Sequence, residues 1–167
     1  YRVCTPYKNA WLFKLSPENL QNYNATLAHL IPQDNIPNVR VNTLSDIGFT
    51  YIENDYIGGE KYAKKLFNQF LIRIDSYKET RDFISINGNS HLSPYIRFGN
   101  VSTRELIRKT IHLESEGAKV WVSEIVWREF YQMILYQFPE VEKQSFNPKY
   151  REMTWYGGNE NFKKWKD

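Results

Sequence analysis

The stretch that decides the fold reads Trp121-Val122-Ser123-Glu124-Ile125-Val126-Trp127-Arg128-Glu129-Phe130-Tyr131. It lies in a wider run, residues 118–138, whose apolar side chains recur at helical spacing and which ends at Pro139. At about 100° per residue, one arc of about 120° gathers two indoles, a phenol, a carboxylate and a guanidinium. These groups belong to Trp121, Glu124, Trp127, Arg128 and Tyr131. The sequence therefore predicts a long helix with one charged, aromatic face.

The residues alone leave two interpretations of this face open. The other faces carry ordinary core residues such as Ile125 and Val126, so the helix is expected to be buried, and buried charges need partners. An internal ion pair between Glu124 and Arg128, at i, i+4, is a common way to supply them. Alternatively, the indoles stack on a planar ligand and the charged pair orients it.

Composition narrows the class of protein. A chain of 167 residues with net charge +3 has the length of one domain, and that charge permits nucleic-acid contact without arguing for it. Aromatic residues make up 16% of the chain, which suits either a ring-rich core or a surface for flat ligands and bases. The one cysteine, Cys4, excludes a disulfide framework and a multi-cysteine metal site. Without an apolar run of about 20 residues or a secretory signal, a cytoplasmic protein is expected.

Helices dominate the rest of the pattern, and no segment alternates well enough to predict a strand. Residues 1–58 show little periodicity, apart from a helix start at Ser16-Pro17. The elements expected after them are a helix from Glu60 to about Ile74, a loop over 84–100, a helix opened by a capping box at Ser102–Glu105, and a helix around 159–166. The chain starts without methionine and stops within an amphipathic stretch, so we expect a piece of a longer protein.

Several motifs together resemble those of the DNA photolyase/cryptochrome family. The run Trp121–Tyr131 is similar to the family signature, and Gly88-Asn89-Ser90-His91-Leu92-Ser93-Pro94-Tyr95-Ile96 is similar to its flavin phosphate loop. Tyr77 with Arg81-Asp82 matches the segment that leads into that loop. Thr5-Pro6-Tyr7 and Ala10-Trp11 look like the junction between the family's first domain and its connector.

The resemblance implies a mainly α fold: an irregular interdomain connector over 1–58, then the N-terminal half of the multihelical FAD-binding domain over 59–167, truncated. It implies FAD as cofactor and UV-damaged DNA as partner, with the antenna chromophore in a domain outside this chain. The implied parent is a deoxyribodipyrimidine photo-lyase, which splits a flipped-out cyclobutane pyrimidine dimer with an electron from light-excited, reduced FAD. A monomeric parent is expected.

The resemblance also implies roles for single residues. Contacts to the phosphate and ribitol part of FAD are expected from Tyr77, Asn89, Ser90, Leu92 and Ser93. Trp121 and Arg128 are expected against the flavin, while Glu124 and Trp127 bind the dimer and form the catalytic pair. Trp155 matches the outermost tryptophan of an electron-transfer relay. No metal ligand is expected.

Two departures from the family pattern and one competing function accompany this interpretation. Thr103 replaces a frequent proline at a helix start, which should matter little. Asn89 stands where the family usually has Thr, although an amide can still donate and accept. His29, His91 and His112 are isolated and are interpreted as ordinary polar residues. A cryptochrome-like photosensor without repair activity is the alternative. The chain by itself is expected to be inactive, and to self-associate because Trp121 and Phe130 would lie exposed.

Overall fold

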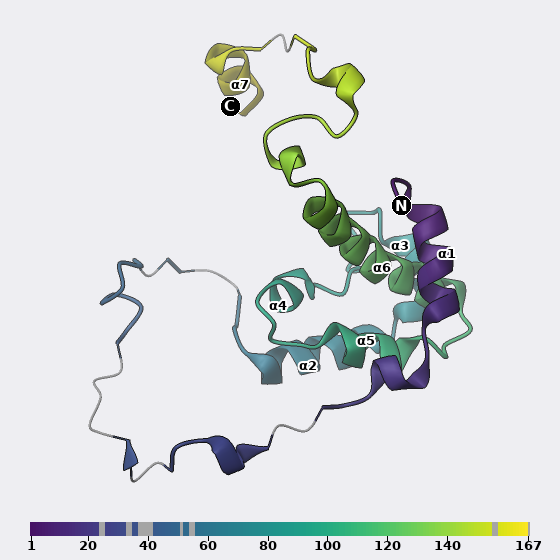
Figure 1. Cartoon of the computed structure of the whole chain (residues 1–167), viewed down its shortest axis with the longest axis vertical. Coiled ribbons are helices and arrows are strands. Elements are labelled where there is room, and N and C mark those ends of the chain that lie inside the picture. The colour runs from purple at the N-terminus through teal and green to yellow at the C-terminus, as the bar shows by residue number, and fades with distance from the viewer. Residues whose placement is uncertain are drawn as a thin grey trace. The chain divides into compact units, whose positions relative to one another are not determined.

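The computed structural model describes residues 1–23, 26–32, 35–36, 42–50, 52–53, 56–154 and 157–166. Over these ranges the chain is helical and contains no strand, so the predicted mainly α fold is confirmed. It divides into two compact units, Tyr1–Lys14 with Ser123–Asp167, and Leu15–Val122. The longest helix, α6 (Glu116–Gln137), belongs to both and lies within two residues of its predicted bounds (Figure 1). None of the helices in the described ranges has the length and apolarity needed to cross a membrane.

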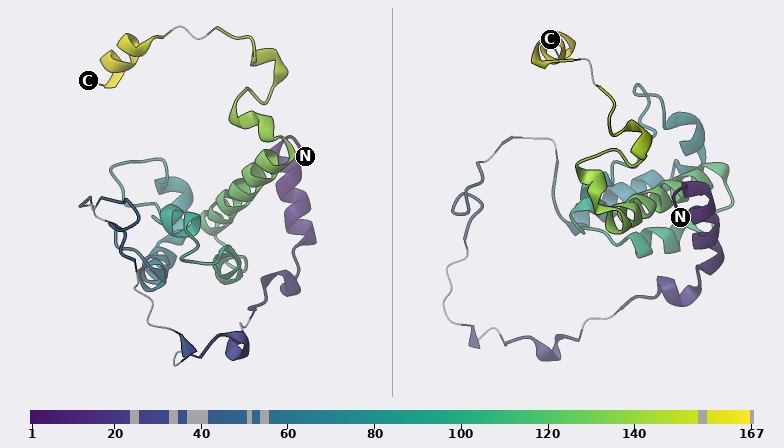
Figure 2. Two further views of the ribbon diagram at one scale, coloured as in Figure 1. Left: turned by 60° about the vertical axis from the view of Figure 1, so that its left-hand side comes forward. Right: turned by 45° about the horizontal axis from the view of Figure 1, so that its top comes forward.

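The unit Leu15–Val122 is built around α2 (Glu60–Leu71), α5 (Thr103–Thr110) and the first turns of α6, which are drawn in Figures 1 and 2. Between α2 and α5 the chain forms the short elements η4 (Ile74–Ser76), α3 (Tyr77–Thr80) and α4 (Ser93–Arg97). The core side chains are Ala63, Phe67, Phe70, Ile74, Leu92, Leu106, Ile107, Ala118 and Trp121. Most of them come from α2, α5 and α6, which form the framework of this unit, and the short helices α3 and α4 add the buried side chains of Tyr77, Tyr95 and Ile96.

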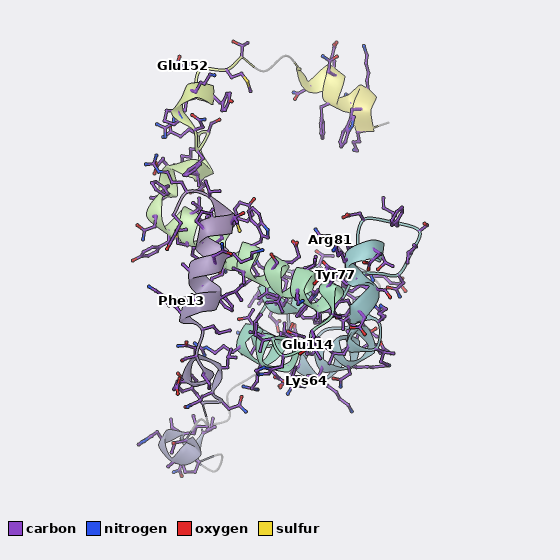
Figure 3. All side chains as sticks on the ribbon, turned by 90° about the vertical axis from the view of Figure 1, so that its right-hand side faces the viewer. Phe13, Lys64, Tyr77, Arg81, Glu114 and Glu152 are labelled. Atoms are coloured by element: carbon purple, nitrogen blue, oxygen red, sulfur yellow. The ribbon has the colours of Figure 1, made fainter. Side chains whose placement is uncertain are left out.

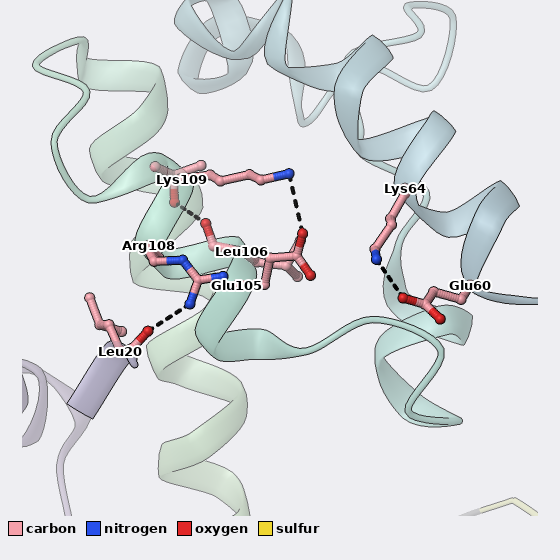
Figure 4. A network of polar contacts seen from close by, with 8 residues as sticks. Leu20, Glu60, Lys64, Glu105, Leu106, Arg108 and Lys109 are labelled. Atoms are coloured by element: carbon pink, nitrogen blue, oxygen red, sulfur yellow. Dashed lines mark hydrogen bonds and ion pairs between the residues drawn. The ribbon is translucent and has the colours of Figure 1, made fainter. Parts of the chain in front are cut away.

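Polar contacts at the rim of this unit are shown in Figure 4. Arg108 of α5 donates through Nη1 to the carbonyl oxygen of Leu20, 2.6 Å away, and so attaches the 3-10 turn η1 (Pro17–Leu20) to α5. Within α5, Lys109 Nζ lies 3.2 Å from Glu105 Oε1, and α2 carries a similar pair formed by Glu60 and Lys64. Exposed pairs of this kind stabilise a helix only slightly, so the apolar core contributes most of the stability.

The second unit joins α1 (Cys4–Lys14) to the later turns of α6, and the two helices lie side by side (Figures 1 and 2). Its core consists of Cys4, Phe130 and Ile134, against which Tyr7, Trp127, Met133, Phe138 and Val141 pack. Beyond α6 follow η5 (Pro139–Glu142), η6 (Pro148–Tyr150) and α7 (Asn159–Lys166), the last at its predicted place. Packing on this small core stabilises α1. The expectation that the first residues would be irregular is therefore wrong for Cys4–Lys14.

Three other predictions about the elements are wrong. The helix expected from Ser16-Pro17 onward is limited to the 3-10 turns η1 and η2 (Leu27–His29), because no described residue from 17 to 32 is buried and an unpacked helix is marginal. The loop expected over 84–100 contains α4. Ser102 precedes α5, yet its side chain makes no capping hydrogen bond, and Glu105 pairs with Lys109 instead.

Candidate cofactor and substrate site

Phe70 is the centre of an aromatic cluster in the unit Leu15–Val122. Its ring is fully buried and lies 5.4 Å from the ring of Trp121 and 5.6 Å from that of Tyr77, edge-on to the latter. Phe67 stacks on Trp121 at 5.7 Å. The fold thus places Trp121 and Tyr77, two residues expected to bind FAD, next to the same ring, that of Phe70.

The expectation that Trp121 and Phe130 would lie exposed is wrong. Trp121 is 3% exposed because Phe67 and Phe70 cover it, and Phe130 is 5% exposed within the small core beside α1. The interpretation of α6 as a largely buried helix therefore holds for these two rings. Self-association stays a prediction, but it no longer rests on them.

Tyr77 and Arg81 extend the cluster towards the surface, and both are labelled in Figure 3. Tyr77 is 7% exposed, and the guanidinium carbon of Arg81 lies 5.6 Å from the centre of its ring. Arg81 Nε also lies 3.3 Å from Asp82 Oδ1. A cation over the face of a phenol ring fixes the orientation of both groups.

The segment 88–93 presents amide and hydroxyl groups around one buried anchor, Leu92, which is 1% exposed. The exposed Asn89 donates through Nδ2 to the carbonyl oxygen of Arg81, 3.4 Å away, and the Leu92 N–H donates to Ser90 Oγ at 3.4 Å. Ser93 is exposed at the first position of α4. Neutral donors of this kind suit an oxyanion such as a phosphate group.

In the other unit, Trp127 is half-buried between two rings of α6. Tyr131 stacks on it at 5.5 Å with an interplanar angle of 27°, and Phe130 meets it edge-on at 5.7 Å. Glu124 and Arg128 are also half-buried, and Arg128 Nη1 donates to Gln132 Oε1 at 3.3 Å. The later part of α6 therefore offers an aromatic surface beside a carboxylate and a guanidinium.

Two pKa shifts in this unit concern groups of α1. Burial raises the pKa of the Cys4 thiol, and the nearby Glu124 carboxylate raises it further while Lys8 opposes the shift. Burial also raises the pKa of the Tyr7 hydroxyl, with the Glu129 carboxylate as the second cause. Both groups therefore stay protonated at neutral pH: Cys4 acts as a packing residue rather than as a nucleophile, and Tyr7 acts as a hydrogen-bond donor.

Comparison with known proteins finds one matching family model and several similar proteins. Residues 121–167 match the family model described as the FAD binding domain of DNA photolyase. The chain is 30% identical, over 99% of its length, to the deoxyribodipyrimidine photo-lyase of Alkalihalophilus pseudofirmus, and 32% identical over 99% to that of Vibrio cholerae serotype O1. The chain is therefore similar to DNA photolyases over nearly its whole length. It covers 36% and 37% of the lengths of these two proteins, so it corresponds to about a third of a photolyase.

FAD is the cofactor of the domain that the chain matches, and the chemistry of the photolyase-like loop fits it. Asn89, Ser90 and Ser93 supply an amide and two hydroxyls that suit a pyrophosphate. The aromatic cluster supplies a rigid apolar boundary, as pockets for flat cofactors require. Several residues of the unit Leu15–Val122 are expected to bind FAD, and they therefore form one continuous region of that unit. They are Tyr77, Asn89, Ser90, Leu92, Ser93 and Trp121.

Sequence reasoning missed three residues that organise the two units, Phe70 and Arg73 in one and Glu129 in the other. Phe70 fits the apolar pattern of α2, but nothing in that pattern indicates that Trp121 and Tyr77 meet on its ring. Arg73 donates to the carbonyl oxygen of Asn89, and Glu129 accepts from Trp11 of α1; both contacts join residues far apart in sequence. Trp155, expected in an electron-transfer relay, lies outside the described residues.

Proposed function

We propose that this chain is part of a light-dependent DNA repair enzyme, a deoxyribodipyrimidine photo-lyase. The observation that supports this most is the identity of about 30% to such enzymes over nearly the whole chain. Because the chain spans about a third of their length, the activity belongs to a longer parent, and the chain by itself is inactive. We propose a monomeric, cytoplasmic parent whose partner is UV-damaged DNA.

The domain organisation is part of this proposal. Residues 1–58 form the connector and residues 59–167 the first half of the FAD-binding domain. Support comes from burial, because none of the described residues between 15 and 62 is buried, whereas Ala63 begins a continuous set of core residues. The helix α1 within the proposed connector has its own small core with the later turns of α6.

FAD, when bound and reduced, supplies the electron that opens the cyclobutane ring. The residues of this chain bind and orient the reactants. Asn89, Ser90, Leu92 and Ser93 hold the pyrophosphate through backbone and side-chain donors, with Tyr77 beside them. Trp121 and Arg128 contact the flavin. Arg128 is half-buried, which strengthens its electrostatic interaction with an electron-rich ring.

The substrate is assigned to the later part of α6. The half-buried Trp127 stacks on one face of the pyrimidine dimer, and Glu124 accepts a hydrogen bond from its polar edge. Stacking between a base and an aromatic side chain stabilises binding by about 1–3 kcal/mol, and Tyr131 and Phe130 already fix the orientation of the Trp127 ring. Trp155 relays electrons during photoreduction of the flavin.

The test of the substrate site is Trp127→Ala in the intact parent protein. We expect binding of dimer-containing DNA to weaken about tenfold or more, which corresponds to the loss of one stacking contact. Tyr136→Ala is the matched control, because Tyr136 lies on α6 about 180° from Trp127 and is 83% exposed. Equal affinity for the Trp127→Ala protein and the control would exclude Trp127 from the substrate site.

The cryptochrome-like photosensor is the competing function. The relatives reported above carry the name photo-lyase, which favours repair. Illumination of the intact parent with UV-irradiated DNA decides between the two: repair removes thymine dimers in the light and not in the dark, whereas a photosensor leaves them unchanged in both.

A further inference from the structure

Arg73 lies in the turn between α2 and η4 and donates hydrogen bonds to two separate segments. Its Nη1 donates to the carbonyl oxygen of Gln69 at 3.2 Å, within the last turn of α2. Its Nη2 donates to the carbonyl oxygen of Asn89 at 2.9 Å and to Asn87 Oδ1 at 3.4 Å. The guanidinium also lies 5.7 Å from the centre of the Phe70 ring. One side chain thus connects the end of α2, the aromatic cluster and the loop.

The Asn87 side chain continues this network along the loop. Its Oδ1 lies 2.9 Å from His91 Nε2, so it is shared between Arg73 and His91. The backbone of His91 has φ 55°, in the left-handed region that non-glycine residues seldom adopt. A residue keeps such a conformation only where its surroundings impose it. In this structure, the hydrogen bonds from Arg73 and His91 to Asn87 Oδ1 impose that conformation on His91.

The hydrogen bond to Asn89 also sets the direction of a backbone donor. A trans peptide group is planar, so its C=O and N–H point in opposite directions. When the Asn89 carbonyl oxygen faces Arg73, the N–H of Ser90 faces away from Arg73. Arg73 therefore determines which way one of the proposed phosphate donors points.

The geometry of Arg73 is not what stability alone favours. Its Nε is buried, and among the described residues no group accepts a hydrogen bond from it. An unsatisfied buried donor is costly and rare, so its presence calls for an explanation. The hydrogen bonds of the two Nη atoms thus fix the position of the guanidinium, and this position leaves Nε without an acceptor among the described residues.

We infer that Arg73 is a positioning residue that holds the loop 87–93 in the conformation that binds the pyrophosphate of FAD. The inference rests on the proposed function, since it assigns that loop to FAD. Arg73 does not contact the cofactor in this scheme; it acts through the Asn89 carbonyl and Asn87. Lysine cannot replace it, because a single ammonium does not hold donors to the Gln69 and Asn89 carbonyl oxygens in one rigid, planar fork that also stacks on Phe70.

The experiment compares Arg73→Met and Arg73→Lys with Lys61→Met in the intact parent protein. Lys61 is an exposed cation of α2, so its replacement removes the same charge without touching the loop. Two quantities are measured for each protein: the amide hydrogen exchange of residues 87–93, and the affinity for FAD after removal and re-addition of the flavin. Circular dichroism and the melting midpoint verify that each variant is folded.

For Arg73→Met we expect exchange of the loop amides to accelerate about tenfold and FAD to bind about tenfold more weakly, as for loss of a charge-assisted hydrogen bond. Arg73→Lys should restore little of the lost exchange protection or FAD affinity. Lys61→Met should match the unchanged protein in both quantities. In a double-mutant cycle with Asn87→Ala, the two effects should be less than additive because they break one network.

Loop exchange that is the same in Arg73→Met and in the unchanged protein would overturn the positioning role. Accelerated exchange with unchanged FAD affinity would mean something different: Arg73 holds the loop, but the loop does not bind FAD, and the proposed function of that loop fails. The two failures are therefore distinguishable.

Discussion

Gly117 lies in the first turn of α6, where the backbone of the helix packs directly on the turn η4. A Cβ atom built at this position would lie much closer to the carbonyl oxygens of Ile74 and Asp75 than van der Waals contact allows. Replacing a helical Gly by Ala normally stabilises a protein by about 0.5–1 kcal/mol, because Gly loses more chain entropy on folding. Here the clash involves backbone atoms, which cannot rotate away as a side chain can. The clash therefore outweighs the entropic gain, and the substitution is expected to destabilise the protein.

We therefore expect Gly117→Ala to lower the free energy of unfolding by about 1–3 kcal/mol, the usual range for overpacking. Chemical denaturation of both proteins measures it. Gly58→Ala is the control, because among the described residues other than its chain neighbours no atom lies within 4 Å of a Cβ at that position, and a change within about 0.5 kcal/mol is expected. A Gly117→Ala protein as stable as the control would contradict the close packing of α6 on η4.

The Tyr7 hydroxyl gives the stability of the α1 region a dependence on pH. Its pKa is raised first by burial and then by the Glu129 carboxylate, which accepts its hydrogen bond at 3.4 Å. The folded state therefore keeps this proton at pH values where the unfolded state has lost it. The contribution of Tyr7 is complete below the unfolded pKa of about 10 and is lost as the pH rises through the folded value.

The expected result is that the stability difference between the unchanged protein and Tyr7→Phe is constant from pH 7 to about 9.5 and falls above about pH 10. Denaturant titrations across this range measure it. Tyr136→Phe controls for alkaline effects that any tyrosine would produce, since the Tyr136 side chain is exposed to solvent. A difference that stays constant to pH 11 would contradict the assigned origin of the shift.

At the scale of elements, α1 is held to α6 by one carboxylate as well as by apolar packing. Glu129 accepts from the Trp11 indole Nε1 at 2.9 Å and from Tyr7, one helical turn earlier on α1. Hydrogen bonds to a charged group are stronger than neutral ones, and exposure to water reduces their net effect. The pair therefore fixes the orientation of α1 more than it adds to the total stability.

We expect Trp11→Phe to lower the free energy of unfolding by about 1 kcal/mol, because it keeps a ring but removes the donor. Trp165→Phe, at an indole that is 81% exposed on α7, is the matched control and should cost nothing measurable. The same Trp11→Phe change in a Glu129→Ala background, which lacks the acceptor, should cost less. If the cost does not depend on residue 129, the hydrogen bond does not contribute.

The elements also show which structural features a sequence can and cannot predict. α6 extends over 22 residues, so its helical period repeats several times, and its end at Pro139 follows from the missing N–H of proline. α4 has five residues, too few for a period, and only Ser93-Pro94 indicates its start. The wrong prediction after Ser16 has the opposite cause: the period is present, but no described neighbour buries it.

The same limit applies to the candidate site. Tyr77, the 88–93 loop and Trp121 could be singled out because each lies in a motif of contiguous residues. Arg73 could not, since it binds the loop through the backbone carbonyl of Asn89, which every residue type possesses. Contacts that use backbone atoms leave no trace in the residue types of the partner. They appear only once the fold brings the two segments together.

At the scale of the whole molecule, the assigned FAD residues offer little surface to a ligand. Tyr77, Leu92 and Trp121 are all buried by their own unit, so a bound flavin would touch mainly their edges. The exposed donors, Asn89 and Ser93, are neutral and cannot balance the charge of a pyrophosphate by themselves. Pockets that bind drug-sized ligands tightly enclose most of the ligand surface, about 70–90%.

We therefore expect the 167-residue chain by itself to hold FAD weakly. After incubation with excess FAD and removal of the free flavin, the purified chain should be colourless, whereas an intact parent treated in the same way should be yellow. The absorption spectrum of the protein fraction measures this, and circular dichroism verifies the helices. Light scattering on the same sample tests the predicted self-association, for which a monomer is the contrary result. A yellow, stoichiometric complex would mean that the buried cluster opens around the flavin, and that the rest of the parent is needed for catalysis but not for binding.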